Sequence, residues 1–237
     1  MKKSLKIFLA AVLIVVAGVA AFAIYTYEQP STTNTMKGTH NILLLCDDPT
    51  EDNGTQGIGS VDMAFAINVV NGSINNVTPI YPGGMRHPTA AEPSVLGTGK
   101  LLLHDSLYGV STEKGAQRAQ EIVEYNTGIK TDAVIMMTPT AVDAFINVIG
   151  PIYVDGYGYV SNNSIEFLRD EQNPGNMTRG AAVESIMNPI FNATKDKSKY
   201  LALAKVALME YSDGNIRVVP SDLVSQFAVA NGLKLIS

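Results

Sequence analysis

The sequence predicts an α/β domain, a layered mixed β-sheet flanked by helices, preceded by one N-terminal transmembrane helix. Three observations support this fold class. Short apolar runs alternate with helical patterns, which is typical of a layered α/β fold with right-handed crossovers. The run Ile42–Leu45 is wholly apolar, as expected for a strand buried on both faces of a sheet. Residues 7–25 contain no charged side chain, which indicates a membrane span.

Composition fits one domain with an N-terminal anchor. The chain has 237 residues, of which 46% are hydrophobic, so a single domain can bury a core. The formal net charge is −5, and this sign argues against a nucleic-acid partner. The one cysteine, Cys46, cannot form an internal disulfide, and we interpret it as a small buried hydrophobic residue.

The N-terminal apolar run predicts a single span, with the cell membrane as a partner. Its nineteen residues are close to the roughly 20 that a spanning helix needs. Lys2, Lys3 and Lys6 precede it, which places the N-terminus in the cytoplasm and the C-terminal domain outside the cell. The alternative is a cleaved signal peptide, because Ala21-Phe22-Ala23 is typical of a cleavage site. Both interpretations export the domain.

We therefore divide the chain into three parts: a cytoplasmic start with the anchor (1–28), a polar linker (29–38) and an extracellular α/β domain (39–237). An exported domain exposes its N-x-Ser/Thr sequons to glycosylation in hosts that glycosylate, although chance also produces sequons in an asparagine-rich chain. The candidate glycosylation sites are Asn53, Asn71, Asn76, Asn162, Asn176 and Asn192.

The expected strands are separated by turn signals. A glycine-rich loop follows Ile42–Leu45, and Asn71-Gly72 predicts a hairpin between Val61–Val70 and Ile74–Ile80. Prolines and glycines in residues 81–92 predict a loop. Further strands are expected at Ala133–Met137, Ile152–Val154 and Ile216–Val219.

Helices are expected between and after these strands. Ser111 or Thr112 caps a helix that ends near Thr127, before Gly128. Thr138-Pro139 opens a helix through Val148. In the C-terminal part, helices are expected at Ser164–Asp170, Thr178–Phe191 and Lys197–Tyr211, and after Ser221. The third of these should bury a stripe containing Leu201, Ala204 and Leu208.

Three aspartates stand at the ends of the first two strands. Asp47 and Asp48 follow Ile42–Leu45, and Asp62 lies at the entry of the second strand. If the strands are neighbours, the three carboxylates gather at one edge of the sheet. Like charges there must be balanced by a cation, an arginine or water. This edge is the main candidate site.

Other motifs do not support a familiar catalytic centre. Residues 97–100 lack two elements of a phosphate-binding loop, and no G-x-S-x-G occurs. His40, His87 and His104 show no metal-ligand spacing. We interpret Arg118 and Arg217 as structural. Arg86, Arg169 and Arg179 lie in loops or at helix ends, where phosphate-binding arginines are often found.

The strand and loop motifs resemble the LytR-CpsA-Psr (LCP) family. Asn41-Ile42-Leu43-Leu44-Leu45-x-Asp47-Asp48, followed by Ser60-x-Asp62-Met63, is similar to N-I-L-L-L-G-x-D followed by R-S-D-T-M. Lys100–Gly109 and Thr127–Val154 resemble two later segments of that family. Residues 81–93 resemble more closely an uncharacterised archaeal branch, known chiefly from methanogens as exported, membrane-anchored domains.

The resemblance implies an LCP-like fold and a chemistry. LCP proteins use Mg²⁺ and arginines to transfer a glycopolymer from a polyprenyl-diphosphate carrier to the cell wall. Carried over by position, Asp47 or Asp48 together with Asp62 would hold Mg²⁺. The implied catalytic arginines are Arg86, Arg169 and Arg179. Lys100, His87 and His104 lie in the matching segments and are candidates for ligand binding.

Two departures from the LCP pattern lie at the acidic edge. Ser60 replaces a phosphate-binding arginine, and Cys46 replaces a glycine. Because phosphoryl transfer needs the diphosphate charge neutralised, losing one cation weakens catalysis. We therefore expect an envelope surface domain that binds glycan or lipid-phosphate ligands. The alternative is a Mg²⁺-dependent phosphotransferase that moves a lipid-linked glycan to the cell surface. Three or more basic side chains at the edge would favour the enzyme, and one or none the binding module.

Overall fold

The computed structural model describes residues 38–51, 59–70, 73–80, 82–169, 185–186, 189–190, 193 and 196–225. The strands are β1 (Thr39–Asp48), β2 (Ser60–Val70), β3 (Ser73–Ile80), β4 (Arg86–Ala91), β5 (Lys100–Leu102), β6 (Ala133–Met137), β7 (Ile152–Val154), β8 (Gly158–Val160) and β9 (Ile216–Val219). The helices are α3 (Thr112–Thr127), α4 (Pro139–Ile149), α5 (Ser164–Arg169) and α7 (Lys197–Ser212). Most of the helix expected at 178–191 lies outside the described residues.

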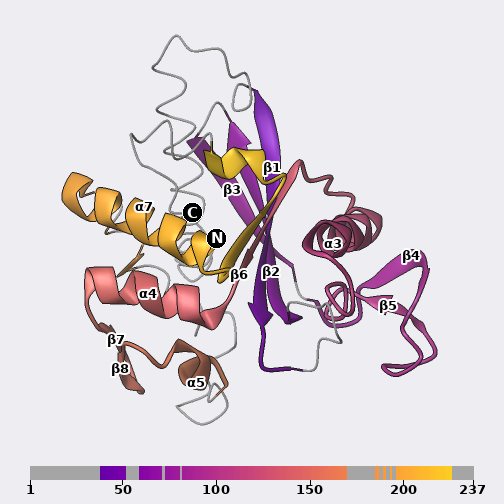
Figure 1. Cartoon of the computed structure of the whole chain (residues 1–237), viewed down its shortest axis with the longest axis horizontal. Coiled ribbons are helices and arrows are strands. Elements are labelled where there is room, and N and C mark those ends of the chain that lie inside the picture. Colours follow the sequence, from indigo (N-terminus) through magenta and orange to yellow (C-terminus); the bar gives the residue numbers. More distant parts are fainter. Residues whose placement is uncertain are drawn as a thin grey trace.

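Five strands form one mixed sheet in the order β3-β2-β1-β6-β9 (Figure 1). β1 is its central strand, antiparallel to β2 and parallel to β6. The outer pairs, β2 with β3 and β6 with β9, are antiparallel. The expected central strand and the expected mixed sheet flanked by helices are therefore confirmed.

Successive residues of β1 face two different cores. Ile42 and Leu44 point into a core shared with α4 and α7, and Leu43 and Leu45 into a core shared with α3. All four are at most 2% exposed. Figure 1 shows the same three layers, with α4 and α7 on one side of the sheet and α3 and the β4–β5 hairpin on the other.

The helix boundaries follow the expected capping signals. The Ser111 side chain accepts a hydrogen bond from the Lys114 amide at the start of α3, and Gly128 ends the helix in the left-handed region at φ 74°. Thr138 caps α4 in the same way, with Pro139 at the first helical position.

Two segments differ from the sequence-based expectation. The predicted loop at 81–92 contains β4, which pairs with β5 through Arg86 opposite Leu102 and Ala91 opposite Lys100. Pro88 is tolerated because this hairpin has two strands and an irregular register, so the ladder does not need its missing amide hydrogen. The strand β7 pairs with β8 in a separate hairpin rather than joining the sheet, because the chain turns back directly after Val154.

No helix in the described part of the chain combines the length and the apolar character that a membrane span requires. The anchor expected at residues 7–25 and the linker lie outside that part. The division of the chain into anchor, linker and exported domain therefore stays a prediction.

Candidate functional site

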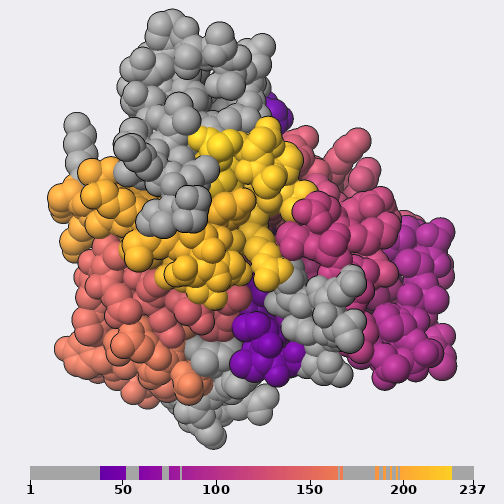
Figure 2. Space-filling model, in the orientation of Figure 1, coloured from indigo at the N-terminus to yellow at the C-terminus, as the bar shows by residue number. Residues whose placement is uncertain are grey.

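The acidic edge forms where β1 ends and β2 begins. In the antiparallel ladder Asp47 lies opposite Val61 and Asp48 opposite Ser60, with a bulge between Cys46 and Asp47. The parallel strand β6 ends beside β1 at the same edge. Ligands of open α/β sheets bind at the carboxyl ends of such neighbouring parallel strands. In Figure 2 an indigo segment from the start of the described chain reaches the surface directly below the yellow C-terminal segment.

Gly59 allows the chain to return this close to β1. Its φ is +126°, which side-chain-bearing residues rarely adopt. A Cβ atom at this position would lie 2.7 Å from the Asp48 carbonyl oxygen, a backbone atom that cannot rotate away. Only glycine therefore brings the start of β2 against the end of β1.

Asp47 is a strongly perturbed carboxyl group at this edge. It is 4% exposed, and its Oδ1 atom has no hydrogen-bond partner. Burial raises its pKa to about 7, and the charges of Asp48 and Asp62 act in the same direction. Arg217 opposes this shift, since its positive charge favours the carboxylate. Asp47 is thus a carboxyl group whose charge needs a cation.

Asp48 has a different local role. Its Oδ1 accepts hydrogen bonds from the Thr50 amide at 2.8 Å and from the Thr50 hydroxyl at 2.7 Å. This is an Asx turn, which directs the chain out of β1. Asp48 therefore has a local structural role, and its charge also acts on Asp47. Asp62 acts on Asp47 from the neighbouring strand.

Arg217 is one of the two arginines that the sequence predicted to have only a structural role. It lies in β9, opposite Met136 of β6. Its Nε donates to the Gly214 carbonyl at 3.3 Å, and one terminal nitrogen donates to the Thr112 hydroxyl at 3.4 Å. These bonds hold the guanidinium group near Asp47. The sequence held one signal that Arg217 has a charged partner. It stands inside a short apolar strand, where an unpaired charge would be costly.

His104 joins the edge from a third segment. Its Nε2 lies 3.3 Å from Glu51 Oε2, and its Nδ1 lies 2.8 Å from Asp105 Oδ1. Ligand atoms of Glu51, Asp62 and His104 all lie within 4.8 Å of one another. The backbone carbonyl of His104 accepts from the Val61 amide at 2.8 Å, which fixes this segment beside β2. Sequence spacing did not indicate the cluster because its members come from separate segments.

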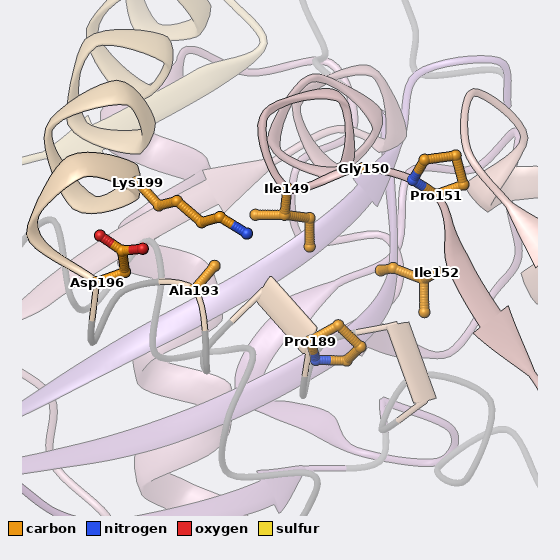
Figure 3. Close-up of a pocket in the computed structure, with 8 residues that line it drawn as sticks. All are labelled: Ile149, Gly150, Pro151, Ile152, Pro189, Ala193, Asp196 and Lys199. Atoms are coloured by element: carbon orange, nitrogen blue, oxygen red, sulfur yellow. The ribbon is translucent and has the colours of Figure 1, made fainter.

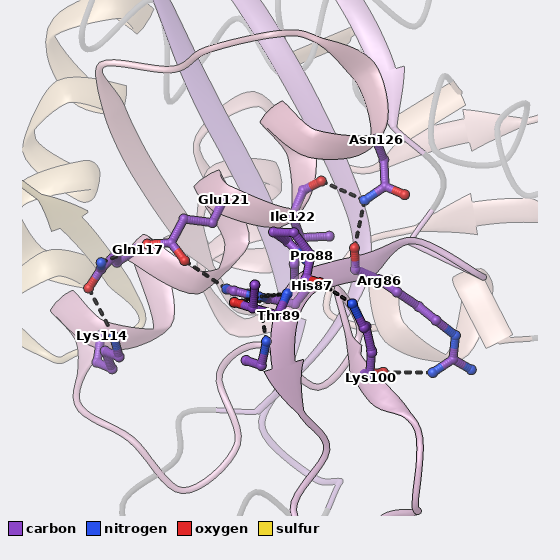
Figure 4. Close-up of polar contacts among 11 residues, drawn as sticks. Arg86, His87, Pro88, Thr89, Lys100, Lys114, Gln117, Glu121, Ile122 and Asn126 are labelled. Atoms are coloured by element: carbon purple, nitrogen blue, oxygen red, sulfur yellow. Dashed lines mark hydrogen bonds and ion pairs between the residues drawn. The ribbon is translucent and has the colours of Figure 1, made fainter.

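His87 takes part in a hydrogen-bond network on the β4–β5 hairpin (Figure 4). It is 5% exposed, its Nε2 lies 2.7 Å from Glu121 Oε2, and its Nδ1 accepts from the amides of Thr89 and Ala90. Acceptance at Nδ1 places the ring proton on Nε2. The network ties β4 to α3, and a ligand-binding role for His87 stays a prediction.

Arg86 and Lys100 bind groups of the same hairpin. The Arg86 guanidinium donates to the Lys100 carbonyl at 2.6 Å, and the Lys100 ammonium donates to the Pro88 carbonyl (Figure 4). Arg86 also pairs with Glu92 at 3.3 Å. The structure does not bring either side chain into the Glu51–Asp62–His104 cluster. Their proposed ligand roles stay predictions.

The remaining candidates lie partly outside the described residues. Arg169 ends α5, but its side chain and the whole of Arg179 are not described. Asn76 and Asn162 are exposed, as glycosylation requires. The other sequons, at Asn53, Asn71, Asn176 and Asn192, lie outside the described residues.

A separate pocket of about 390 Å³ lies between the end of α4 and the start of α7 (Figure 3). Ile149, Ile152 and Ala193 line its apolar part, and Asp196 and Lys199 its polar rim. Asp196 caps α7 through the Ser198 amide and hydroxyl. None of the acidic-edge residues lines this pocket.

A family model described as "Protein of unknown function (DUF4012)" matches residues 37–172, more than half of the chain. The chain belongs to the DUF4012 family. The matched region runs from β1 to α5 and ends before β9, so Arg217 lies beyond it. No curated protein matches the chain.

Solved structures show the fold of this DUF4012 chain. TagV of B. subtilis superposes with a TM-score of 0.51 at 15% identity, over 83% of this chain and 80% of that chain. Protein gbs0355 from Streptococcus agalactiae also superposes with a TM-score of 0.51, at 12% identity, over 82% and 73%. At such identities the likeness shows the fold alone. The DUF4012 chain therefore shares its fold with TagV, which supports the expected LCP-like fold. The archaeal affiliation stays a prediction.

Proposed function

We propose that this DUF4012 chain is a Mg²⁺-dependent phosphotransferase of the cell envelope, which moves a glycopolymer from a polyprenyl-diphosphate carrier to the cell surface. The observation that carries this proposal is the buried Asp47 carboxyl group, which lies within range of the charges of Asp62 and Arg217. Opposite charges at one sheet edge suit a ligand that contains both a cation and an anionic diphosphate. The LCP-like fold supports the same assignment.

The side chains of Asp47 and Asp62 fit a Mg²⁺ ion. A buried carboxylate oxygen without a hydrogen-bond partner is costly, and a bound cation would satisfy Oδ1 of Asp47. Mg²⁺ usually takes one or two protein carboxylates and completes its shell with water and substrate phosphates. When bound, the ion would supply neutralisation of charge on the diphosphate oxygens.

Arg217 supplies a fixed positive charge for the transferring group. Its hydrogen bonds to Gly214 and Thr112 hold the guanidinium in place before substrate arrives, which lowers the cost of stabilising the transition state. In the reaction one P–O bond forms to the acceptor hydroxyl and one P–O bond of the diphosphate breaks. Prenyl monophosphate leaves, and the acceptor proton passes to solvent.

A binding module without turnover is the second candidate. The small number of basic residues at the edge favours it. Ser60 is buried at the position where LCP proteins carry an arginine. Within the described ranges, Arg217 is the arginine whose charge acts on Asp47. By the criterion given above, a single basic side chain at the edge favours a module that binds a phosphate ligand.

Binding and turnover of one substrate separate the two candidates. The full-length chain is incubated with Mg²⁺ and a short-chain prenyl diphosphate carrying a sugar; calorimetry measures binding and chromatography measures released prenyl monophosphate. We expect Asp62→Asn and Arg217→Gln each to lower turnover by about 100-fold or more. Arg118→Gln is the matched control, because that guanidinium binds the Tyr108 carbonyl. Arg86→Ala tests the role that the resemblance implies.

Each outcome has one meaning. Turnover that depends on Asp62 and Arg217 supports the enzyme. Binding that depends on them without any release of prenyl monophosphate supports the module. Absence of binding, or binding that neither substitution weakens, rejects both candidates.

A further inference from the structure

The cluster of Glu51, Asp62 and His104 differs in chemistry from the carboxylate pair proposed for Mg²⁺. It combines one imidazole with two carboxylates, drawn from the turn after β1, from β2 and from the segment after β5. Mg²⁺ selects oxygen ligands. Imidazole together with carboxylates suits transition-metal ions such as Zn²⁺.

The spacing of the ligand atoms fits such an ion. Two ligands bound tetrahedrally at about 2.0–2.1 Å lie about 3.3 Å apart. The distance between His104 Nε2 and Glu51 Oε2 is 3.3 Å. The ligand atom of Asp62 lies within 4.8 Å of both, so a small side-chain adjustment completes a three-ligand site.

Asp105 orients the imidazole for metal binding. Its Oδ1 lies 2.8 Å from His104 Nδ1, and its side chain is 14% exposed. A proton on Nδ1 donated to this carboxylate leaves the lone pair of Nε2, the atom nearest Glu51, available to a metal ion. Carboxylate–histidine–metal arrangements of this kind are common in zinc sites, where the second carboxylate fixes the tautomer.

The surroundings of the cluster favour a positive ligand and allow its entry. The buried Asp47 carboxyl group, whose Oδ1 has no partner, lies within electrostatic range of Asp62. The side chains of Glu51 and His104 are 44% and 38% exposed. An ion can therefore enter from solvent, and water can occupy the fourth position.

We infer that Glu51, Asp62 and His104 bind a divalent transition-metal ion, with Zn²⁺ as the expected occupant and Asp105 as the residue that positions His104. The ion would join three segments that are distant in sequence at the mouth of the acidic edge. Asp62 is common to this cluster and to the pair proposed for Mg²⁺, so the two ions would compete for it. The inference does not rest on the proposed function, because zinc binding requires neither diphosphate nor Arg217.

Zinc titration of the untagged, full-length chain tests the inference. Calorimetry measures the affinities for Zn²⁺ and Mg²⁺ without phosphate, and Co²⁺ replaces zinc to report tetrahedral nitrogen and oxygen ligation by visible absorption. We expect zinc to bind at least about 100-fold more tightly than Mg²⁺. Glu51→Gln, His104→Gln and Asp105→Asn should each weaken zinc binding about 10- to 100-fold.

His40→Gln is the matched control. His40 also pairs with an aspartate, Asp132 at 3.5 Å, but it lies at the opposite end of β1. Zinc affinity should be unchanged in this variant, and an equal loss there overturns the inference. Absence of zinc binding, zinc binding unaffected by Glu51→Gln and His104→Gln, or Mg²⁺ binding as tight as zinc binding overturns it as well. Thermal midpoints of all variants identify any loss caused by unfolding, and the exposed Glu51 provides a ligand variant that keeps the core intact.

Discussion

Asp47 shows how one residue couples stability to the candidate site. Burial raises its pKa to about 7, whereas an unfolded chain leaves it near the usual value of 3.8. Between these values the folded protein binds more protons than the unfolded protein. The resulting stabilisation is fully present below the unfolded pKa and is lost as the pH rises through the folded pKa.

We therefore predict that metal-free protein loses stability between about pH 4 and pH 7, by an amount of the order of a few kcal/mol. Asp47→Asn should remove this slope and raise the thermal midpoint at pH 8, because no charge then remains to be buried. Differential scanning calorimetry in the presence of a chelator measures both effects. Asp155→Asn, at an exposed position, should retain the wild-type slope. A wild-type slope in Asp47→Asn would contradict the prediction.

The thiol of Cys46 should be inert in the folded protein. Burial, together with the charges of Asp47 and Asp62, raises its pKa to about 12. Since the thiolate is the nucleophile, only about 1 in 10⁴ molecules is reactive at pH 8. We expect aromatic disulfide reagents to label Cys46 slowly in buffer and at once in guanidinium. The structure places Cys46 as a partly buried residue packed against the core. Equal rates in the two conditions would refute this protection of the thiol.

At the scale of elements, β1 connects both cores to the candidate site. Leu44 is fully buried against the core that contains Phe65 and Ile135. Removing its side chain leaves a cavity on one face of the central strand, and the two cores hold that strand from both sides. The aspartates at the end of β1 depend on the same packing for their positions.

Leu44→Ala should lower the free energy of unfolding by about 2–5 kcal/mol, which is typical of large-to-small changes in a core. Urea denaturation followed by circular dichroism measures this loss. Leu201→Ala makes the same chemical change in α7 at a residue that is 43% exposed, and it should cost less than about 1 kcal/mol. Equal costs for the two variants would show that β1 is not the buried central strand.

At the scale of the whole molecule, the candidate site lies at one edge of a three-layered domain. Among the described elements, β1, β2, β9 and the start of α3 meet at that edge. A lipid-linked substrate would have to reach this edge from the membrane surface. The proposed function therefore requires an anchored chain with its domain outside the cell.

We predict that the apolar residues 7–25 anchor the chain and that the domain lies outside. Tyr125 of α3 is 66% exposed, so Tyr125→Cys introduces a reactive surface thiol. A membrane-impermeant maleimide should label this variant in intact cells, whereas wild type, with Cys46 alone, should stay unlabelled. Labelling of the variant only after lysis would reverse the orientation.

Local sequence patterns determined the elements and part of the site. The apolar run of β1, the caps of α3 and α4, and the aspartates at strand ends are set by neighbouring residues, and strand pairing then places Asp47 and Asp62 together. Helical periodicity was less informative in α7. Leu203, Ala204 and Leu208 are buried there, whereas Leu201 of the expected stripe is exposed, because packing against α4 selects the face.

Only the tertiary structure decided which charges meet at the edge. Arg217 lies about 170 residues after Asp47 in the chain, and β9 reaches it by pairing with β6. Burial of Asp47, and not of Glu51, follows from the packing around the end of β1. His104 reaches Glu51 and Asp62 because its segment is bound to β2 at Val61. Such contacts depend on the relative positions of distant segments, so no local pattern in the sequence encodes them.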